Sequence, residues 1–324
     1  MKAIRMHGYG ASDVLRLEEL EDPEPGAGEV RVRIGASALN HVDIDVREGT
    51  SRMDIELPHI LGFETAGTIE RVGAGVDGWR AGDRVVPYAY ALRKGARALG
   101  GGYADRIVVP SDGLAKTPEA LDDVAAAAVQ LAFGTAWHML HARGRLAAGE
   151  TVLISSVSAG VASAAVQVAH RAGATTIGTS SSPAKLERAM ALGLDHGIDY
   201  TREDVAERVA EITGGRGVDL AIEHVGGERF PEALKALAER GRLVTCGAHA
   251  GEVVDLDIIP FFRAEQSILG SRGHSVEELG HVLALAARGE LVPLVGDTFP
   301  LAGAAAAMDR LASREVFGKV VLVP

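Results

Sequence analysis

The chain has 324 residues, which corresponds to about two domains at roughly 150 residues each. It carries 33 lysines and arginines against 44 aspartates and glutamates, and this net charge of −11, with no basic run, excludes nucleic acid as an expected partner. The one cysteine, Cys246, excludes a disulfide framework and a cysteine-rich zinc site within a single chain.

Residues 1–120 are predicted to form short strands joined by turns that contain glycine and proline. Residues 29–34 alternate between apolar and basic side chains, which is the period of a half-buried strand. Further strands are expected at 67–72, 84–87 and 106–110. This part of the chain is therefore predicted to be a small antiparallel barrel or sandwich.

From about residue 121 the pattern changes to strands that alternate with helices. An alanine-rich helix at 122–139 leads into apolar strands at 151–155, 175–179, 218–223, 242–246 and 268–271, with helices between them at 161–172, 183–192, 202–212 and 229–240. Repeated strand–helix units of this kind predict a doubly wound parallel sheet. A helix at 276–288 and a strand at 319–323 are expected to return to the first domain.

The predicted α/β fold therefore has two domains, one at 1–121 completed by 272–324 and one at 122–271. The longest uncharged stretches, 124–142 and 151–170, contain several polar side chains, whereas a bilayer span needs about 20 predominantly apolar residues. Lys2 and Arg5 interrupt the start of the sequence before an apolar segment forms, so no signal peptide is expected. We expect a cytoplasmic protein without membrane contact.

The turn after the strand at 151–155 is rich in small residues. A dinucleotide site needs such a turn, because the backbone approaches a pyrophosphate and presents the amides of a helix N-terminus to it. Val157, Ala159 and Ala162 stand where a GxGxxG pattern has glycine, so the motif itself is absent. The alternative is a packed turn without a ligand. The cofactor residues predicted here are Ser158, Ala159, Gly160 and Val161.

The segment after the next strand, 178–185, has no acidic residue that would accept a ribose 2′-hydroxyl and select NAD. Its hydroxyl side chains, among them Ser180, and the cation of Lys185 suit a 2′-phosphate instead. This composition predicts NADPH as the cofactor. The alternative is a helix cap followed by an exposed lysine.

The segments ALNHVDIDVREG (38–49) and PHILGFETAGTIERVG (58–73) resemble the catalytic domain of the medium-chain dehydrogenase/reductase superfamily. The resemblance continues in the right order through 82–86, 101–104, 135–140, 214–219, 241–247 and 317–322, and so covers nearly the whole chain. It implies an N-terminal GroES-like β-barrel domain and a Rossmann domain, with the active site between them. It also implies a homodimer formed by pairing of the strands at 268–271.

Within that superfamily, the resemblance places the zinc ligands of the alcohol dehydrogenases at Asn40, Phe63 and about Leu131. Phenylalanine and leucine do not coordinate zinc and asparagine is a poor ligand, so no metal is expected. The sequence therefore resembles the zinc-free quinone oxidoreductase (zeta-crystallin-like) branch. Without a Lewis acid, hydride addition to a conjugated acceptor is easier than alcohol oxidation. An improvised zinc site, for example one that includes His41 and Asp43, remains an alternative.

The resemblance also implies roles for single residues. Asn40 would lie beside the nicotinamide, and Lys319 would reach the cofactor. The other implied cofactor contacts are Thr135, Ser180, Lys185, Tyr200 and Gly247. We hypothesise that His41 or Tyr88 donates a hydrogen bond to the substrate oxygen. Asp45 stands where many quinone reductases have tyrosine, which weakens any prediction of substrate orientation.

Two further residues have structural interpretations. Glu64 is predicted to be an internal carboxylate paired with a nearby base, and Cys246 to be a core residue rather than a nucleophile. The predicted function is NADPH-dependent reduction of a quinone or an α,β-unsaturated carbonyl compound. The alternatives are an alcohol dehydrogenase with an atypical zinc site and a catalytically silent NADPH-binding protein, the latter because of the missing glycines.

Overall fold

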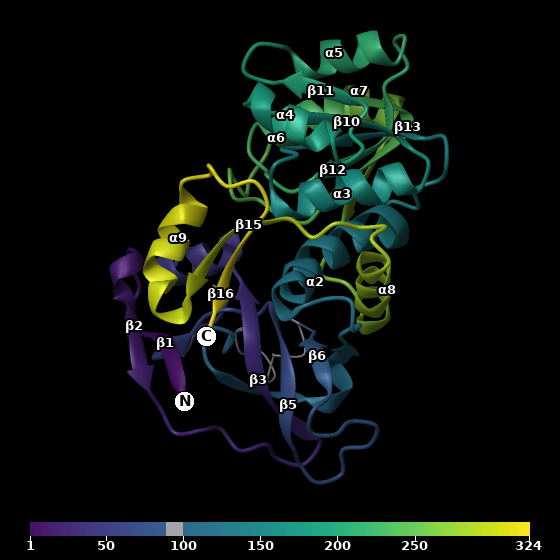
Figure 1. Cartoon of the computed structure of the whole chain (residues 1–324). Helices are drawn as coiled ribbons and strands as arrows, with labels where there is room; N and C mark the ends of the chain where they lie inside the picture. The colour runs from purple at the N-terminus through teal and green to yellow at the C-terminus, as the bar shows by residue number, and fades with distance from the viewer. Residues whose placement is uncertain (89–99) are drawn as a thin grey trace. The chain divides into compact units, whose positions relative to one another are not determined.

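The computed structural model describes residues 1–88 and 100–324. This part of the chain divides into two compact units (Figure 1). Unit 1 comprises Met1–Leu131 and Ser275–Pro324, so it holds both termini, and unit 2 comprises Ala132–His274. Helix α2 (Asp123–Trp137) begins in unit 1 and ends in unit 2.

Two sheets form the framework of unit 1. In the described residues, the strands of the larger sheet follow the order β15 (Val295–Pro300), β16 (Lys319–Val323), β3 (Glu29–Ala38), β5 (Thr65–Val72), β6 (Arg84–Pro87) and β8 (Leu114–Lys116). Strand β7 (Arg106–Pro110) lies outside this order and pairs with β3. The smaller sheet has the order β2 (Leu15–Glu19), β1 (Lys2–Met6) and β4 (His59–Ile60). The strands expected at 29–34, 67–72, 84–87 and 106–110 are confirmed. Strand pairing in the described residues gives no closed barrel, so closure stays a prediction.

Strand β3 shows why this sheet has one buried face. Val30, Val32 and Ile34 are buried and join one apolar cluster, whereas Arg33 is exposed, as the alternating sequence predicts. The helices of this unit are α1 (His41–Glu48), α8 (Val276–Ala287) and α9 (Ala304–Ala312), with 3-10 turns at Ser12–Val14, Ser111–Gly113 and Leu301–Gly303. Helix α9, which packs on β16, was not predicted.

Unit 2, all of whose residues are described, is built on a six-stranded parallel sheet. The strand order is β11 (His196–Asp199), β10 (Thr175–Ser180), β9 (Thr151–Ile154), β12 (Val218–Glu223), β13 (Leu237–Thr245) and β14 (Ser267–Gly270). Helix α3 (Gly160–Arg171) packs on β9 and β10, α4 (Pro183–Met190) on β10 and β11, and α6 (Arg229–Lys235) on β12 and β13. Helices α5 (Val205–Ile212) and α7 (Ile258–Arg263) complete the unit. The predicted parallel sheet is confirmed.

The helix predicted at 229–240 was wrong at its C-terminal end. Helix α6 ends at Lys235, and the next residues open strand β13. The register against β12 shifts between the pairs Val218–Leu237 and Leu220–Arg242, which accommodates the left-handed backbone of Arg240 (φ 60°). Tertiary pairing therefore overrides a helical pattern here. Strand β11 and helix α7 were not predicted, and α2 continues as a π-helix at His138–Arg143.

No helix in the described part of the chain is long and apolar enough to cross a membrane.

Candidate functional site

Asn40, Glu64 and Lys319 form a buried polar cluster in unit 1. The Lys319 Nζ donates to Asn40 Oδ1 at 2.6 Å and lies 2.7 Å from Glu64 Oε2. The Asn40 Nδ2 donates to the same carboxylate oxygen at 2.8 Å. Glu64 is completely buried and Lys319 is 6% exposed. The prediction that Glu64 pairs with a nearby base is confirmed, and the base is Lys319.

The sheet of unit 1 brings these three residues together. Asn40 follows β3, Glu64 immediately precedes β5, and Lys319 opens β16. Because β3 pairs antiparallel with both β5 and β16, the ends of the three strands meet. The other carboxylate oxygen of Glu64 accepts the backbone N–H of Leu131 at 2.8 Å, so Glu64 also holds helix α2. Both ends of the Asn40 amide are thus oriented by charged partners.

A second buried carboxyl group, Asp43, supports this cluster. Its Oδ2 accepts the backbone N–H of Asn40 at 2.8 Å and the hydroxyl of Tyr103 at 3.0 Å, and its Oδ1 accepts from the backbone of Gly62 at 3.3 Å. Burial raises the pKa of Asp43 to about 7, although these hydrogen bonds oppose the shift. Burial, with the charge of Asp43, likewise holds the pKa of Tyr103 well above its ordinary value. Asn40 and Asp43 form the capping box at the start of α1, and this box fixes the backbone of Asn40.

The residues of this region do not fit a zinc ion. Phe63 is a buried apolar side chain, Leu131 contributes a backbone N–H rather than a ligand, and Glu64 is already paired with Lys319. Within residues 1–88 and 100–324, no three His, Cys, Asp or Glu side chains converge as a metal-binding group. A catalytic zinc site needs three such ligands, and positions 40, 63 and 131 do not supply them.

In unit 2, the small-residue turn joins β9 to α3. Ala159 is the N-cap of α3 and has no side-chain acceptor to offer the first amides of the helix. Thr179 anchors the turn, because its Oγ1 accepts the N–H of Ser156 at 3.1 Å and its carbonyl accepts the N–H of Val157 at 2.9 Å. Ser158, Gly160 and Val161 thus lie in a fixed turn at the carboxyl edge of the parallel sheet, where doubly wound folds bind ligands.

Val157 stands where the GxGxxG pattern has glycine, and Gly178 on the neighbouring strand β10 leaves room for its side chain. A Cβ added to Gly178 would lie 2.3 Å from Cγ1 of Val157, so the glycine of β10 provides the space that the valine fills. Val157 and Ala162 are both fully buried. Their side chains therefore belong to the packing between sheet and helix.

Ser180 and Tyr200 come together at the ends of β10 and β11. Ser180 pairs with Asp199 in the parallel register, and the N–H of Tyr200 donates to the carbonyl of Ser180 at 3.2 Å. The Oγ of Ser180 accepts the N–H of Ser182 at 3.3 Å, where α4 begins. Lys185 is half-buried in the first turn of α4.

The remaining predicted residues are placed by separate elements. Thr135 is buried in α2 within unit 2, and Gly247 follows β13, where a Cβ would lie 2.5 Å from the carbonyl oxygen of His224. In unit 1, His41 opens α1 and is half-buried, and Tyr88 follows β6 and donates its N–H to Gly113 at 2.7 Å. Of the predicted residues, the structure brings Asn40 into contact with Lys319 and Ser180 into contact with Tyr200.

Sequence reasoning missed two residues at the end of β12. Glu223 is fully buried and accepts the N–H groups of Val225 (2.8 Å) and Gly226 (3.1 Å). The Nε2 of His224 lies 3.0 Å from the carbonyl oxygen of Ser155, and burial lowers the pKa of His224 to about 4, so the ring is neutral at pH 7. A carboxylate as the last residue of an apolar strand, three positions before a pair of glycines, was the available signal.

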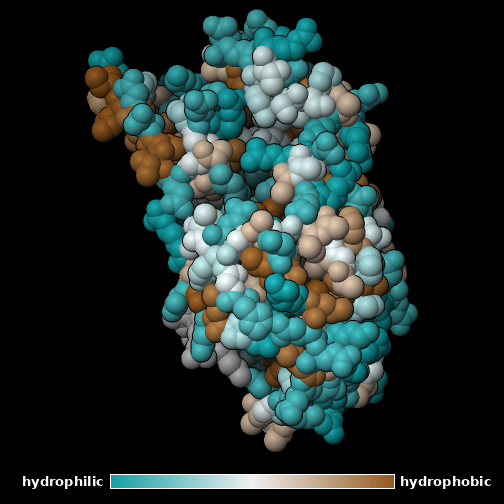
Figure 2. All heavy atoms as spheres, turned by 90° about the vertical axis from the view of Figure 1, so that its left-hand side faces the viewer, coloured by the Kyte–Doolittle hydropathy of each residue, from teal (hydrophilic) through white to brown (hydrophobic). Residues whose placement is uncertain are grey.

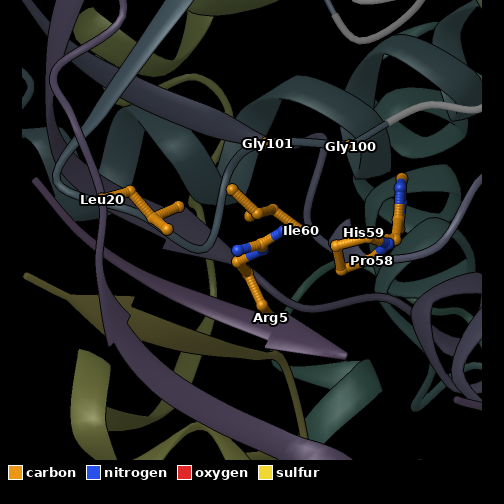
Figure 3. Close-up of a pocket in the computed structure, with 7 residues that line it drawn as sticks. All are labelled: Arg5, Leu20, Pro58, His59, Ile60, Gly100 and Gly101. Atoms are coloured by element: carbon orange, nitrogen blue, oxygen red, sulfur yellow. The ribbon is translucent and has the colours of Figure 1, made fainter. Parts of the chain in front are cut away.

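A separate cavity of about 430 Å³ opens in unit 1 between β1, β4 and the segment 100–101 (Figure 3). It is lined by Arg5, Leu20, Pro58, His59, Ile60, Gly100 and Gly101. None of the predicted catalytic or cofactor residues is among them. We therefore do not assign this cavity to the predicted site.

The doubly wound sheet of unit 2 and the mostly antiparallel sheet of unit 1, with its buried polar cluster, define a two-unit α/β protein. Residues 26–119 match the family described as alcohol dehydrogenase GroES-like domain, and residues 160–288 match zinc-binding dehydrogenase. A quinone oxidoreductase of Pseudomonas aeruginosa is 35% identical over 332 residues (100% of this chain, 99% of the relative). A 2-haloacrylate reductase of a Burkholderia species is 33% identical over 336 residues (99% and 98%).

Solved structures show the same likeness over the whole chain. A crystal structure described as an NAD-dependent alcohol dehydrogenase has a TM-score of 0.94 and 37% identity, with both chains covered completely. The quinone oxidoreductase of Escherichia coli in complex with NADPH has a TM-score of 0.90 and 29% identity, also with complete coverage. The chain belongs to the medium-chain dehydrogenase/reductase superfamily, in its zinc-free quinone oxidoreductase branch, and is an oxidoreductase.

Proposed function

We propose that this protein is an NADPH-dependent reductase that transfers hydride to a quinone or an α,β-unsaturated carbonyl compound. In this proposal the NADP-binding Rossmann domain is 122–271, which contains nearly all of unit 2 and the first part of α2. Unit 1 supplies the GroES-like catalytic domain, a closed barrel at 1–121 completed by 272–324. The observation that carries the proposal is the pair Ser180 and Tyr200 at the carboxyl edge of the sheet, next to the start of α4 and without an acidic residue between 178 and 185.

The residues at this edge fit an anionic dinucleotide. The first amides of α3 and the small side chains of Ser158–Val161 suit a pyrophosphate, since a helix N-terminus attracts negative charge. Ser180, Lys185 and Tyr200 offer hydroxyl groups and a cation to a 2′-phosphate. Thr135, Gly247 and Lys319 are proposed as further cofactor contacts. A similar solved structure is described as NAD-dependent, so the choice of NADPH needs a direct measurement.

When bound, the reduced nicotinamide supplies the hydride. The chain's own residues orient the reactants, and the Asn40 amide is the best-fixed group because Lys319 donates to its Oδ1 while its Nδ2 donates to Glu64. His41 or Tyr88 is proposed to donate a hydrogen bond and then a proton to the oxygen of the acceptor. A conjugated acceptor spreads the developing negative charge, so oriented donors suffice for this reaction.

The test follows the absorbance of NADPH with a panel of quinones, enones and haloacrylates. We expect oxidation with at least one acceptor class, and full retention of that activity after dialysis against a chelator. Tight NADPH binding without reduction of any acceptor would establish the silent binding protein instead. Loss of activity with chelator and recovery with Zn²⁺ would establish an alcohol dehydrogenase with an atypical zinc site.

His41→Ala and Tyr88→Phe identify the proton donor in the same assay. Removal of one hydrogen-bond donor to a developing oxyanion lowers kcat by about 100- to 1000-fold. We expect that loss in one of the two variants, with the Kd of NADPH unchanged in both. Unchanged kcat in both variants would remove these residues from the mechanism.

We also propose that the protein is a homodimer. Strand β14 stands at the edge of the parallel sheet of unit 2, and an uncovered edge is a template for pairing with another chain. Large apolar side chains are exposed nearby in the chain, on α7 and before it: Val253, Ile258, Ile259 and Phe262. Apolar side chains gather on a projecting part of the surface at the upper left of Figure 2. A second copy would cover both features. The cytoplasmic location remains a prediction.

Light scattering during size-exclusion chromatography measures the oligomeric state. We expect a dimer for the natural chain and a monomer for Phe262→Glu. Leu17→Glu, which places a charge at an exposed apolar side chain of unit 1, is the matched control and should remain dimeric. A monomeric natural chain, or a dimer that survives Phe262→Glu, would contradict pairing at this edge.

A further inference from the structure

The guanidinium group of Arg229 lies over the ring of Tyr200, with 4.5 Å between Cζ and the ring centroid. The two residues come from different elements, because Tyr200 follows β11 and Arg229 opens α6. Tyr200 is one of the side chains proposed above to receive the 2′-phosphate, and Arg229 has no role in that proposal. A cation over an aromatic face attracts the ring electrostatically, and arginine is the side chain that stacks best.

The Tyr200 ring is held by its surroundings. It packs against the apolar cluster that includes Ile198 and Val205, and the Tyr200 backbone is bound to Ser180. Arg229 contacts a face of the ring. These contacts together restrict the direction in which the phenol hydroxyl points.

Arg229 forms an ion pair with Glu232, and its positive charge balances part of the negative charge of the nearby carboxylates. Its Nη1 lies 2.6 Å from Oε2 of Glu232, and the two side chains are 21% and 35% exposed. Burial raises the pKa of Glu232, Arg229 opposes this shift, and the nearby carboxylates of Asp204 and Glu228 raise the pKa further. Without the arginine, these carboxylates would repel a nearby 2′-phosphate dianion, whereas NADH carries no such group.

We propose that Arg229 is a positioning residue that fixes the Tyr200 ring and thereby sets the preference for a 2′-phosphorylated dinucleotide over an unphosphorylated one. This inference rests on the proposed function, since it assumes that Ser180, Lys185 and Tyr200 receive a 2′-phosphate. The inference adds Arg229, which is not one of these three proposed phosphate ligands, to the residues that determine cofactor preference. The arginine acts through Tyr200 and through the charge of Glu232, with no direct contact to the reacting atoms.

The test measures the Kd of NADPH and of NADH by fluorescence titration of the whole protein. Arg229→Met keeps the length and apolar stem of the side chain and removes the cation. We expect the Kd of NADPH to rise about 5- to 10-fold, within the range of a partly buried cation–π contact, and the Kd of NADH to change by less than about 2-fold. Arg208→Met, which removes another ion-paired arginine of unit 2, should leave both Kd values unchanged.

A double-mutant cycle separates the contact from a general effect on folding. In the Tyr200→Leu background, Arg229→Met should cause a clearly smaller loss of NADPH affinity, because the ring that it positions is gone. Glu232→Gln releases the anchor without altering either ring or guanidinium, and should shift the NADPH-to-NADH ratio less than Arg229→Met does. If Arg229→Met does not fold, Glu232→Gln is compared with the natural protein, and an unchanged ratio of the NADPH and NADH Kd values would count against the proposal.

The outcomes distinguish this inference from the proposed function. If the natural protein binds NADPH and NADH equally, the proposed cofactor is wrong. If the natural protein prefers NADPH and Arg229→Met keeps the same preference, only the role of Arg229 is overturned. An equal rise of both Kd values in Arg229→Met, or the same loss with and without Tyr200, would also overturn it, because either result indicates a structural role alone.

Discussion

Glu64 and Lys319 form an ion pair with 2.7 Å between Oε2 and Nζ, and their side chains are 0% and 7% exposed. The pair joins the start of β5 to the C-terminal strand of the same sheet. Removal of one partner of a buried pair leaves an uncompensated charge, which costs more than the pair itself contributes.

Glu64→Gln should therefore lower the free energy of unfolding by about 3–5 kcal/mol, because the amide keeps the shape of the carboxylate but leaves the ammonium of Lys319 unpaired. Urea denaturation measures the change. Glu24→Gln, which removes an exposed carboxylate that pairs with Arg31 and Arg71, should cost less than about 1 kcal/mol, because Arg31 keeps its second partner Glu70. Equal small losses in the two variants would contradict the structural importance of the buried pair.

Lys185→Ala should weaken NADPH binding far more than NADH binding, because only NADPH carries the 2′-phosphate. Loss of a charge-assisted contact of this kind corresponds to about a 10- to 100-fold rise in Kd. Arg188→Ala removes an exposed cation from the last turn of the same helix and should leave both Kd values nearly unchanged. If Lys185→Ala weakened both dinucleotides equally, Lys185 would not be a 2′-phosphate ligand.

Ala162→Leu should abolish dinucleotide binding. Ala162 is fully buried in the first turn of α3, so a larger side chain displaces the helix start from the pyrophosphate position. Ala165→Leu introduces the same volume at another buried position further along α3, and either substitution costs about 1–3 kcal/mol of stability. Isothermal titration with NADPH should show a loss in the first variant alone. An unchanged Kd in Ala162→Leu would mean that the cofactor binds elsewhere.

Asp43 should make the protein less stable as the pH rises through its folded-state pKa. Burial raises that pKa from 3.8 to about 7, so between these values the folded protein holds a proton that the unfolded chain has lost. The contribution of Asp43 is thus fully present below pH 3.8 and is lost as the pH approaches 7, by at most about 1.4 kcal/mol per pH unit.

Asp43→Asn removes this dependence while keeping groups that can bind Tyr103 and the backbone of Asn40. The difference in unfolding free energy between the natural chain and this variant, measured by urea denaturation over this pH interval, should fall steadily. A difference that is constant with pH would show that Asp43 titrates alike in the folded and unfolded states.

Cys246 should be chemically inert in the folded protein. Cys246 follows β13 and is half-buried as a residue, but its thiol is desolvated: this burial, with a smaller effect of Glu223, raises the pKa of the thiol to about 12, and only the thiolate reacts. Ellman's reagent should react about 1000-fold more slowly with the native protein than with the urea-unfolded chain, in proportion to the thiolate fraction. Fast reaction in the native state would contradict the interpretation of Cys246 as a core residue.

Much of the fold follows from local sequence patterns. The alternation at 29–34 predicted β3, and the repeated apolar strands predicted the parallel sheet of unit 2. Local patterns failed where tertiary contacts compete with them. Leu237 and Ala238 look helical in sequence, yet pairing with β12 makes them part of a strand. The short strand β11 depends on its pairing with β10 and its packing against α4, which no local pattern shows.

By itself, the sequence determined the class of the protein, the absence of zinc-ligand chemistry at positions 40, 63 and 131, and the internal character of Glu64. Only the tertiary structure decided which groups meet. Lys319 reaches Asn40 because β16 pairs antiparallel with β3. Arg229 reaches Tyr200, which follows β11, from the start of α6, a helix that packs on β12 and β13. Sequence periodicity records which face of an element is buried. It carries no information on the partner that a polar side chain finds far along the chain, which depends on strand order and register.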